Sequence, residues 1–128
     1  MNLKVVDSSG WLHYFMNGAL AEPYSKILVG RLPRIVTPTV VLYEVYRRVK
    51  QKLGDDVASS CAAEMEKTQV FGLSSDIAYR AADLSIEYKL ATADALVYAS
   101  AVSLRMKLIT SDSDFKNLPN VEYISSKE

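Results

Sequence analysis

Two repeating patterns of apolar and polar residues run along the chain. Short apolar runs rich in β-branched residues predict strands at residues 3–7, 34–38, 70–74, 107–110 and 121–125. Longer segments whose apolar residues recur every three or four positions predict helices at residues 8–17, 22–32, 38–53, 55–69, 74–89 and 92–106. Strands that alternate with helices are typical of an α/β fold. We therefore predict a three-layer α/β/α sandwich around a mostly parallel central sheet.

The segment from Thr37 to Gly54 carries the clearest helix signal. Thr37 suits the capping position, Pro38 the first helical position and Gly54 the position just past the end. The apolar row of this helix consists of Val41, Val45, Val49 and Leu53. Thr92 is predicted to cap the last helix in the same way.

Composition favours an ordinary globular protein. Of the 128 residues, 49% are apolar and 23% are charged, so we expect a single domain over residues 1–128 with one core. No apolar run approaches the roughly 20 residues of a membrane span, and the first residues lack the apolar segment of a leader peptide. The single cysteine, Cys61, excludes an internal disulfide and suits a reducing compartment. We therefore expect a cytoplasmic protein.

The net charge is zero, but the charges are unevenly distributed. Residues 26–52 contain seven bases and one acid, whereas residues 53–88 contain seven acids and two bases. A basic face suits a polyanionic partner, and a set of solvated helix faces explains the same pattern equally well.

Four carboxylates stand where a parallel sheet gathers ligands. Asp7 ends the first predicted strand and Asp112 follows the strand at 107–110, so both lie at the edge formed by the carboxyl ends of the strands. Asp94 falls in the first turn of its helix, and Glu44 falls in the second turn of the helix that starts at Pro38. Taken alone, each acid has a simple structural explanation, such as a helix cap, a helix dipole, a turn or a surface ion pair.

Taken together, these acids predict a metal site. Carboxylates at one edge repel one another, and burial raises that cost, so such a cluster is kept where a cation neutralises it. An all-oxygen site with no second cysteine and no histidine suits a hard ion, Mg²⁺ or Mn²⁺. The chemistry that follows is metal-assisted phosphoryl transfer or phosphodiester hydrolysis.

The segments around the acids resemble the motifs of a known family. "VVDSS", "TPTVVLYEVYRR", "TADALVYASA" and "LITSDSDF" are similar to the four acidic motifs of PIN-domain ribonucleases, in family order and at about family spacing. The resemblance covers nearly the whole chain and is closest to the VapC-type toxins of type II toxin–antitoxin pairs. It implies a PIN-like sandwich with a parallel sheet, and a site that holds one or two Mg²⁺ or Mn²⁺ ions and cuts single-stranded or loop RNA.

The resemblance also implies roles for individual residues. The catalytic quartet would be Asp7, Glu44, Asp94 and Asp112. Asp7, Asp94 and Asp112 would bind the metal directly, and Glu44 would act through a water molecule. The accessory residues would be Asp114, Ser8, Thr110 and Ser111. Ser8 would orient Asp7, while Thr110 and Ser111 would hold the turn and bond a substrate phosphate.

Basic and aromatic residues near the acids are candidates for RNA contact. Arg47 and Arg48 follow Glu44 on the same helix and are predicted phosphate contacts, with a solvated helix face as the equal alternative. Tyrosines stack on bases, although core packing explains most of them. The candidates are Tyr14, Tyr43, Tyr46 and Tyr98. His13, the only histidine, is expected to be structural.

A VapC-type protein is also expected to have protein partners. The resemblance implies a cognate antitoxin, a homodimer and an RNA substrate, with no membrane association. The segments "WLHYFM" and "YSKILVG" are candidates for the antitoxin groove and, equally, for ordinary core.

Three alternatives fit parts of the sequence. A phosphoacceptor signalling domain also has an acidic Mg²⁺ pocket, but it expects two adjacent acids on the first strand and a lysine beyond a late strand. Here the first strand delivers Asp7 alone, and no lysine follows Asp112 until Lys116. A PIN-like RNA-processing nuclease without an antitoxin has the same site. A binding module that has lost the chemistry is disfavoured by the four intact acids.

Overall fold

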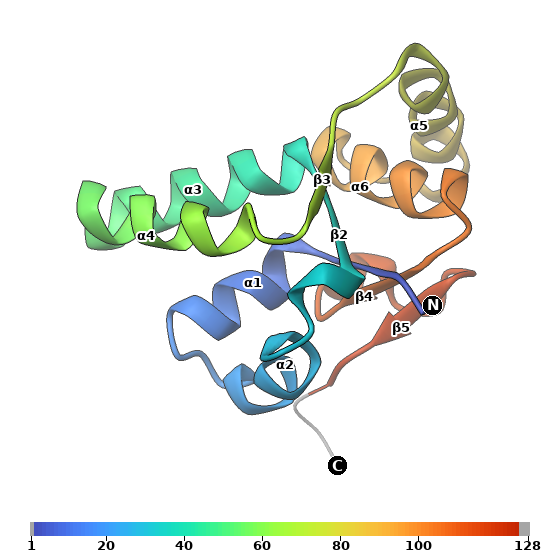
Figure 1. Ribbon diagram of the computed structural model, residues 1–128. Helices are drawn as coiled ribbons and strands as arrows, with labels where there is room; N and C mark the ends of the chain where they lie inside the picture. Colours follow the sequence, from blue (N-terminus) through green and yellow to red (C-terminus); the bar gives the residue numbers. More distant parts are fainter. Residues whose placement is uncertain (1, 126–128) are drawn as a thin grey trace.

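The computed structural model describes residues 2–125, which form five strands and six α-helices (Figure 1). The strands are β1 (Lys4–Val6), β2 (Ile35–Pro38), β3 (Gln69–Phe71), β4 (Lys107–Thr110) and β5 (Val121–Tyr123). The helices are α1 (Ser8–Phe15), α2 (Ala21–Leu28), α3 (Thr39–Leu53), α4 (Asp55–Met65), α5 (Ser75–Tyr88) and α6 (Thr92–Ser103). Two 3₁₀ turns, η1 (Leu32–Arg34) and η2 (Ser113–Phe115), precede β2 and follow β4. In the described range, no helix is long and apolar enough to cross a membrane.

The strands form one sheet in the order β3-β2-β1-β4-β5, and every neighbouring pair is parallel. The chain builds outward from β1 through β2 and β3 in one direction, and then through β4 and β5 in the other. The order therefore reverses between β1 and β4. Such a switch point opens a crevice beyond the carboxyl ends of the strands. Asp7 and Asp112 follow these two strands, so the fold places both acids at the crevice.

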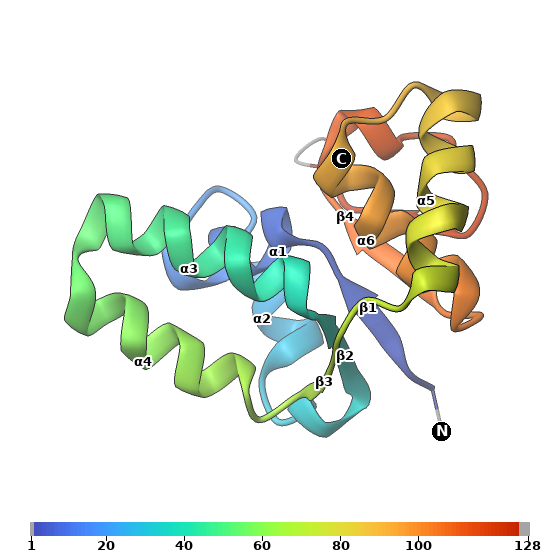
Figure 2. The same cartoon turned by 90° about the horizontal axis from the view of Figure 1, so that it is seen from above.

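Helices cover both faces of the sheet. The two views place α1 to α4 on one side of the strands and α5 with α6 on the other (Figures 1 and 2). Right-handed crossovers explain this arrangement, because the β1–β2 and β2–β3 connections run along the sheet in one direction and the β3–β4 connection runs in the other, which leaves their helices on opposite faces. The predicted three-layer sandwich is confirmed, and all the strand pairs are parallel.

Two features of α3 show where the sequence pattern predicted the packing and where it did not. Val41, Val45 and Val49 are completely buried, as predicted, but Leu53 is 48% exposed. Leu53 is the last residue of α3, and Gly54 with φ 91° turns the chain into α4 immediately afterwards. The row therefore leaves the core one turn before the helix ends.

Two predicted helix caps are wrong. Helix α3 begins at Thr39, so its N-cap is Pro38 and not Thr37. Thr37 is buried in β2, where its hydroxyl lies 2.6 Å from the Thr68 hydroxyl, so a tertiary hydrogen bond replaces the expected cap. Helix α6 begins at Thr92 itself, after Ala91. The strand predicted at 70–74 lies at 69–71.

Candidate metal centre

Asp7 is the only charged residue that is fully buried in the range 2–125, with 2% of its surface exposed. It lies between β1 and α1, at the N-cap position of the helix. Its Oδ2 accepts hydrogen bonds from Thr110 Oγ1 at 2.8 Å and from Ser9 Oγ at 3.2 Å. Its Oδ1 is buried without a hydrogen-bond partner among the described atoms. Burial raises the pKa of Asp7, although the Thr110 hydrogen bond opposes the rise.

Thr110 joins the ends of the two central strands. Its Oγ1 donates to Asp7 and accepts a hydrogen bond from the backbone N–H of Asp112 at 3.0 Å. Oδ1 of Asp112 accepts from the backbone N–H of Asp114 at 2.9 Å, so Asp112 caps η2. The turn is anchored by Phe115, which is completely buried. This hydrogen bond uses one of the two carboxylate oxygens of Asp112. Asp112 can therefore cap the turn and also belong to an acidic cluster.

Three acids converge beside this turn. Asp94, Asp112 and Asp114 each offer one carboxylate oxygen, and the three oxygens lie within 4.8 Å of one another. Asp94 comes from the first turn of α6, while the other two come from the η2 turn. Asp7 lies outside this group of three, but its negative charge is near enough to raise the pKa of Asp94. Asp114, expected as an accessory, therefore stands with two of the predicted ligands.

Electrostatic repulsion between the predicted acids changes their pKa values. Burial raises the pKa of Asp94 to about 7, and the charges of Asp112 and Asp7 add to the rise. Burial also raises the pKa of Glu44 on α3, with the charge of Asp7 adding to it. A hydrogen bond from the Ser8 hydroxyl opposes the rise at Glu44. The four acids thus form one electrostatic cluster, in which the charges of Asp7 and Asp112 make Asp94 and Glu44 harder to ionise.

The cluster fits a divalent cation. A buried carboxylate oxygen without a partner is costly, and Asp7 Oδ1 is such an atom. Asp94, Asp112 and Asp114 supply the converging oxygens that a hard cation prefers. A bound cation would relieve the repulsion that raises the pKa of Asp94 and Glu44. These residues are therefore the ones able to hold Mg²⁺ or Mn²⁺.

Ser9 and Tyr24 belong to the surroundings of the site, and the sequence did not single them out. The hydroxyl that donates to Asp7 is that of Ser9, while the Ser8 hydroxyl bonds Glu44. The Tyr24 hydroxyl on α2 lies 2.6 Å from Ser111 Oγ, and burial raises the pKa of Tyr24 to about 12. The Tyr24 ring packs against Gly10, where a Cβ would overlap it. The small residues of "SSG" were the only sequence clue to this contact.

Comparisons with known proteins identify the family. The PIN domain family matches residues 4–121 of the chain. The chain belongs to the PIN domain family. The predicted resemblance is therefore confirmed. No curated protein sequence matches the chain significantly.

Solved structures have the same fold as this PIN domain. A toxin–antitoxin complex from Klebsiella pneumoniae is 25% identical with a TM-score of 0.77, covering 94% of this chain and 99% of its own. The sarcin–ricin loop cleaving toxin VapC20 from Mycobacterium tuberculosis is 21% identical with a TM-score of 0.79, and the match covers 92% of this chain and 96% of the toxin chain. VapBC2 from Rickettsia felis, bound to a promoter DNA fragment, is 16% identical with a TM-score of 0.76, and the match covers 96% of this chain and 98% of the matched chain.

The remaining predicted residues of this PIN domain divide into exposed and buried groups. Arg47 and Arg48 are exposed on α3 and line a hollow of about 300 Å³ together with Glu44 and Tyr43, which is 65% exposed. Tyr98 instead belongs to the core, where its hydroxyl donates to the Pro119 carbonyl at 2.6 Å.

His13 has the structural role that was predicted. Its ring stacks on Tyr24 with 6.2 Å between centroids, and its Nδ1 accepts a hydrogen bond from the Leu20 N–H at 3.3 Å.

The segments expected to form an antitoxin groove lie mostly in the core. Trp11, Tyr24 and Leu28 are completely buried, because α1 and α2 pack against each other and the sheet. Val29 is the large apolar residue of these segments that is exposed, at 58%. For Trp11, Tyr24 and Leu28 the alternative of ordinary core therefore holds, and large exposed apolar side chains are found on α3, α4 and α5. These exposed side chains include Tyr43, Tyr46, Val57, Tyr79 and Ile86.

Replacing Thr110 by valine tests how strongly the two strand ends depend on one hydroxyl. The variant keeps the side-chain shape but loses the bonds to Asp7 Oδ2 and to the Asp112 N–H. We expect Mn²⁺ affinity, measured by calorimetry, to fall by roughly 10- to 100-fold, as is typical when a group that orients metal ligands is removed. Thr110→Ser retains the hydroxyl and should recover most of the affinity. Equal Mn²⁺ affinity in the valine variant and the wild type would contradict this role.

Proposed function

We propose that this PIN domain is a metal-dependent endoribonuclease that acts as the toxin of a toxin–antitoxin pair. The observation that carries the proposal is the convergence of Asp94, Asp112 and Asp114 beside buried Asp7, whose Oδ1 lacks a partner. This arrangement lies at the switch point of a parallel sheet, where ligands bind in such folds. The only histidine, His13, is engaged by the Tyr24 ring and the Leu20 N–H, and the only cysteine, Cys61, lies on α4.

The protein groups would divide the chemistry between them. When bound, Mg²⁺ or Mn²⁺ supplies activation of water and neutralisation of charge on the phosphate. Asp94, Asp112 and Asp114 would hold the cation, and Asp7 would offer Oδ1 as a further ligand. Glu44, oriented by the Ser8 hydroxyl, would position the attacking water and accept its proton. Thr110 would keep the Asp7 and Asp112 carboxylates in place.

The α3 surface beside Glu44 would bind the RNA strand. Arg47 and Arg48 line the hollow next to Glu44 and would pair with phosphates. Tyr43, exposed at the same hollow, would stack on an unpaired base, and Tyr46 lies one turn further along α3. Ser111 would contact a phosphate near the cut bond. A single strand suits such a surface, because stacking requires bases that are not already paired.

The solved structures support a protein partner. The Klebsiella pneumoniae relative is a toxin–antitoxin complex, and the Rickettsia felis relative is a VapBC complex bound to DNA. We infer that this chain likewise binds a cognate antitoxin, and that it forms a homodimer. An RNA-processing role without an antitoxin would leave the same acids in place, so growth arrest on expression, relieved by the antitoxin, distinguishes the two roles.

Cleavage of a generic single-stranded RNA tests the enzymatic part. The wild type with Mg²⁺ or Mn²⁺ should produce fragments, and chelation with EDTA should stop the reaction. Asp112→Asn should reduce the rate by about 100-fold or more, because it weakens the site that neutralises the phosphate charge. A DNA strand of the same sequence serves as the substrate control. Equal cleavage by wild type and Asp112→Asn would refute the assignment of the site.

A further inference from the structure

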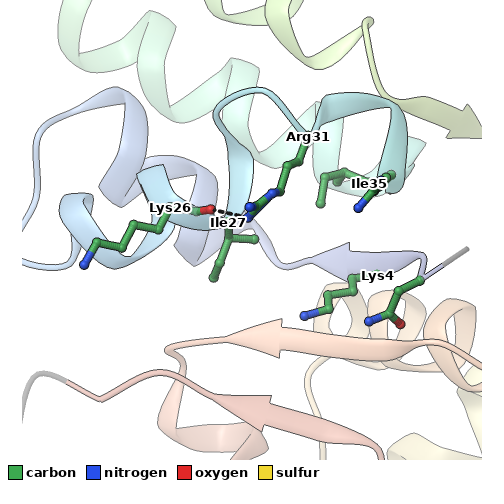
Figure 3. Close-up of a pocket in the computed structure, with 7 residues that line it drawn as sticks. Lys4, Lys26, Ile27, Arg31 and Ile35 are labelled. Carbon is green, nitrogen blue, oxygen red and sulfur yellow. Dashed lines mark hydrogen bonds between the residues drawn. The ribbon is translucent and has the colours of Figure 1, made fainter.

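A second hollow, of about 230 Å³, lies at the amino-terminal ends of β1 and β2, at the edge of the sheet opposite the acids (Figure 3). It is lined by the cations Lys4, Lys26, Arg31 and Arg34, together with Asn2 and two isoleucines. No acid lines it. Because the chain has a net charge of zero, four cations around one hollow are a marked local excess of positive charge.

The cations reach the hollow from separate elements. Figure 3 shows Lys4 extending from β1 toward the space below Ile27, while Arg31 bends back toward the end of α2. Arg31 donates one N–H to the Lys26 carbonyl at 3.0 Å, which orients the guanidinium and leaves four N–H groups for another partner. The Lys4 side chain is 31% exposed, and its Nζ lies 3.7 Å from the Glu122 carboxylate, a loose pair. Lys107 on β4 stands in register beside Lys4 and adds a further positive charge.

A helix dipole explains only part of this cluster. Lys26 lies in the last turn of α2, and the Arg31 side chain donates a hydrogen bond to the Lys26 carbonyl. Both cations therefore stabilise the negative end of that helix. Lys4 belongs to β1 and Arg34 to η1, and neither gains from those carbonyls. Their positive charges repel the other two. An anion that enters the hollow would remove the repulsion.

The lining suits a phosphate group. Arginine presents a fork of N–H donors that matches phosphate oxygens, lysine adds a compact charge, and the Asn2 amide adds neutral donors. Ile27 and Ile35 form apolar walls that limit screening by water. We propose that this hollow binds a phosphate group, carried either by an RNA strand or by a small free polyphosphate. The site is independent of the proposed function, because none of the acids of the metal centre takes part.

Titration followed by NMR tests the proposal. The protein carries Asp112→Asn and is kept in EDTA, so that RNA remains intact whatever the activity of the acidic site. The two probes are tripolyphosphate and a short single-stranded RNA. Lys26→Gln and Arg34→Gln each remove one charge from the hollow, and Arg80→Gln, on α5 at the far side of the sheet, is the matched charge control. Backbone amide shifts of residues 2–4, 26–32 and 34–35 report on the hollow.

We expect at least one probe to shift these amides, and Lys26→Gln and Arg34→Gln each to weaken its binding by roughly tenfold, the loss of one charge-assisted hydrogen bond. Arg80→Gln should bind like the parent. A response to RNA alone would identify a strand phosphate as the ligand, and a response to tripolyphosphate would identify a free anion. The proposal is overturned if these amides do not move, or if Arg80→Gln weakens binding as much as the other two variants.

Discussion

Replacing Asp94 by asparagine is expected to abolish RNA cleavage and, at the same time, to stabilise the metal-free protein at neutral pH. The first effect follows because Asp94 is one of the three acids whose oxygens converge. The second follows because burial and the charges of Asp112 and Asp7 raise the pKa of Asp94 from 3.8 to about 7. At pH 8 the folded wild type must hold a carboxylate that its surroundings disfavour, and the neutral amide removes that cost.

The sign of the pH dependence can be worked out directly. A raised pKa means that the folded state binds the proton more tightly than the unfolded state. The stabilisation from the proton is fully present below about pH 4 and is lost as the pH rises toward about 7. The stability difference between Asp94→Asn and the wild type should therefore grow over this range and then level off. Because Asp94 is partly solvated, we expect roughly 1–3 kcal/mol at pH 8 rather than the full shift.

Denaturant unfolding in EDTA at pH 5 and pH 8 measures the difference in stability between the two proteins. The RNA cleavage assay measures the loss of activity. Asp83→Asn, on the exposed surface of α5, is the matched control and should change neither quantity appreciably. If Asp94→Asn is less stable than the wild type at pH 8, repulsion does not govern the stability of this site.

Adding a divalent cation is expected to have the second large effect. It should make the wild type more stable than Asp94→Asn, the reverse of the order without metal. Mg²⁺ or Mn²⁺ would bind the folded state and not the unfolded chain, so it should raise the melting temperature of the wild type in proportion to the logarithm of its concentration. At 100 times the dissociation constant the stabilisation is about 2.7 kcal/mol. Asp94→Asn should gain little under the same conditions, so the order of stability of the two proteins should invert.

The affinity for the cation should also rise with pH. Protons and the cation compete for Asp94, and burial raises the pKa of Asp7 and Glu44 as well. Binding should therefore release protons and be tighter at pH 8 than at pH 6, as calorimetry in buffers of different ionisation enthalpy measures. If binding is independent of pH across this range and releases no protons, these acids are not the ligands.

The placement of the acids could be predicted because it depends on strand ends. Asp7 and Asp112 each follow a short apolar run, and parallel strands bring such positions to one edge. Asp94 could be placed because a residue in the first turn of a helix stays near the loop that precedes it. These predictions use only the order and type of the elements, which the period of apolar residues reveals.

The finer contacts could not be predicted, because they depend on side-chain direction and on distant partners. Ser8 and Ser9 are neighbours, but one residue turns a helix by about 100°, so Ser9 bonds Asp7 and Ser8 bonds Glu44. Tyr24 reaches Ser111 across 87 positions, and no local pattern reports that contact. Thr37 had the right residue type for a cap, but a buried hydroxyl partner on Thr68 competed for it.

The hydrogen bond between Thr110 and Asp7 spans 103 positions, and this separation has a consequence for synthesis. Strand β1 leaves the ribosome long before its neighbour β4 is made. A growing chain therefore lacks the arrangement that gathers the acids, and long-range parallel pairing is slow to form. A protein that cuts RNA would thus be harmless to the messenger and ribosome that produce it until β4 has been translated.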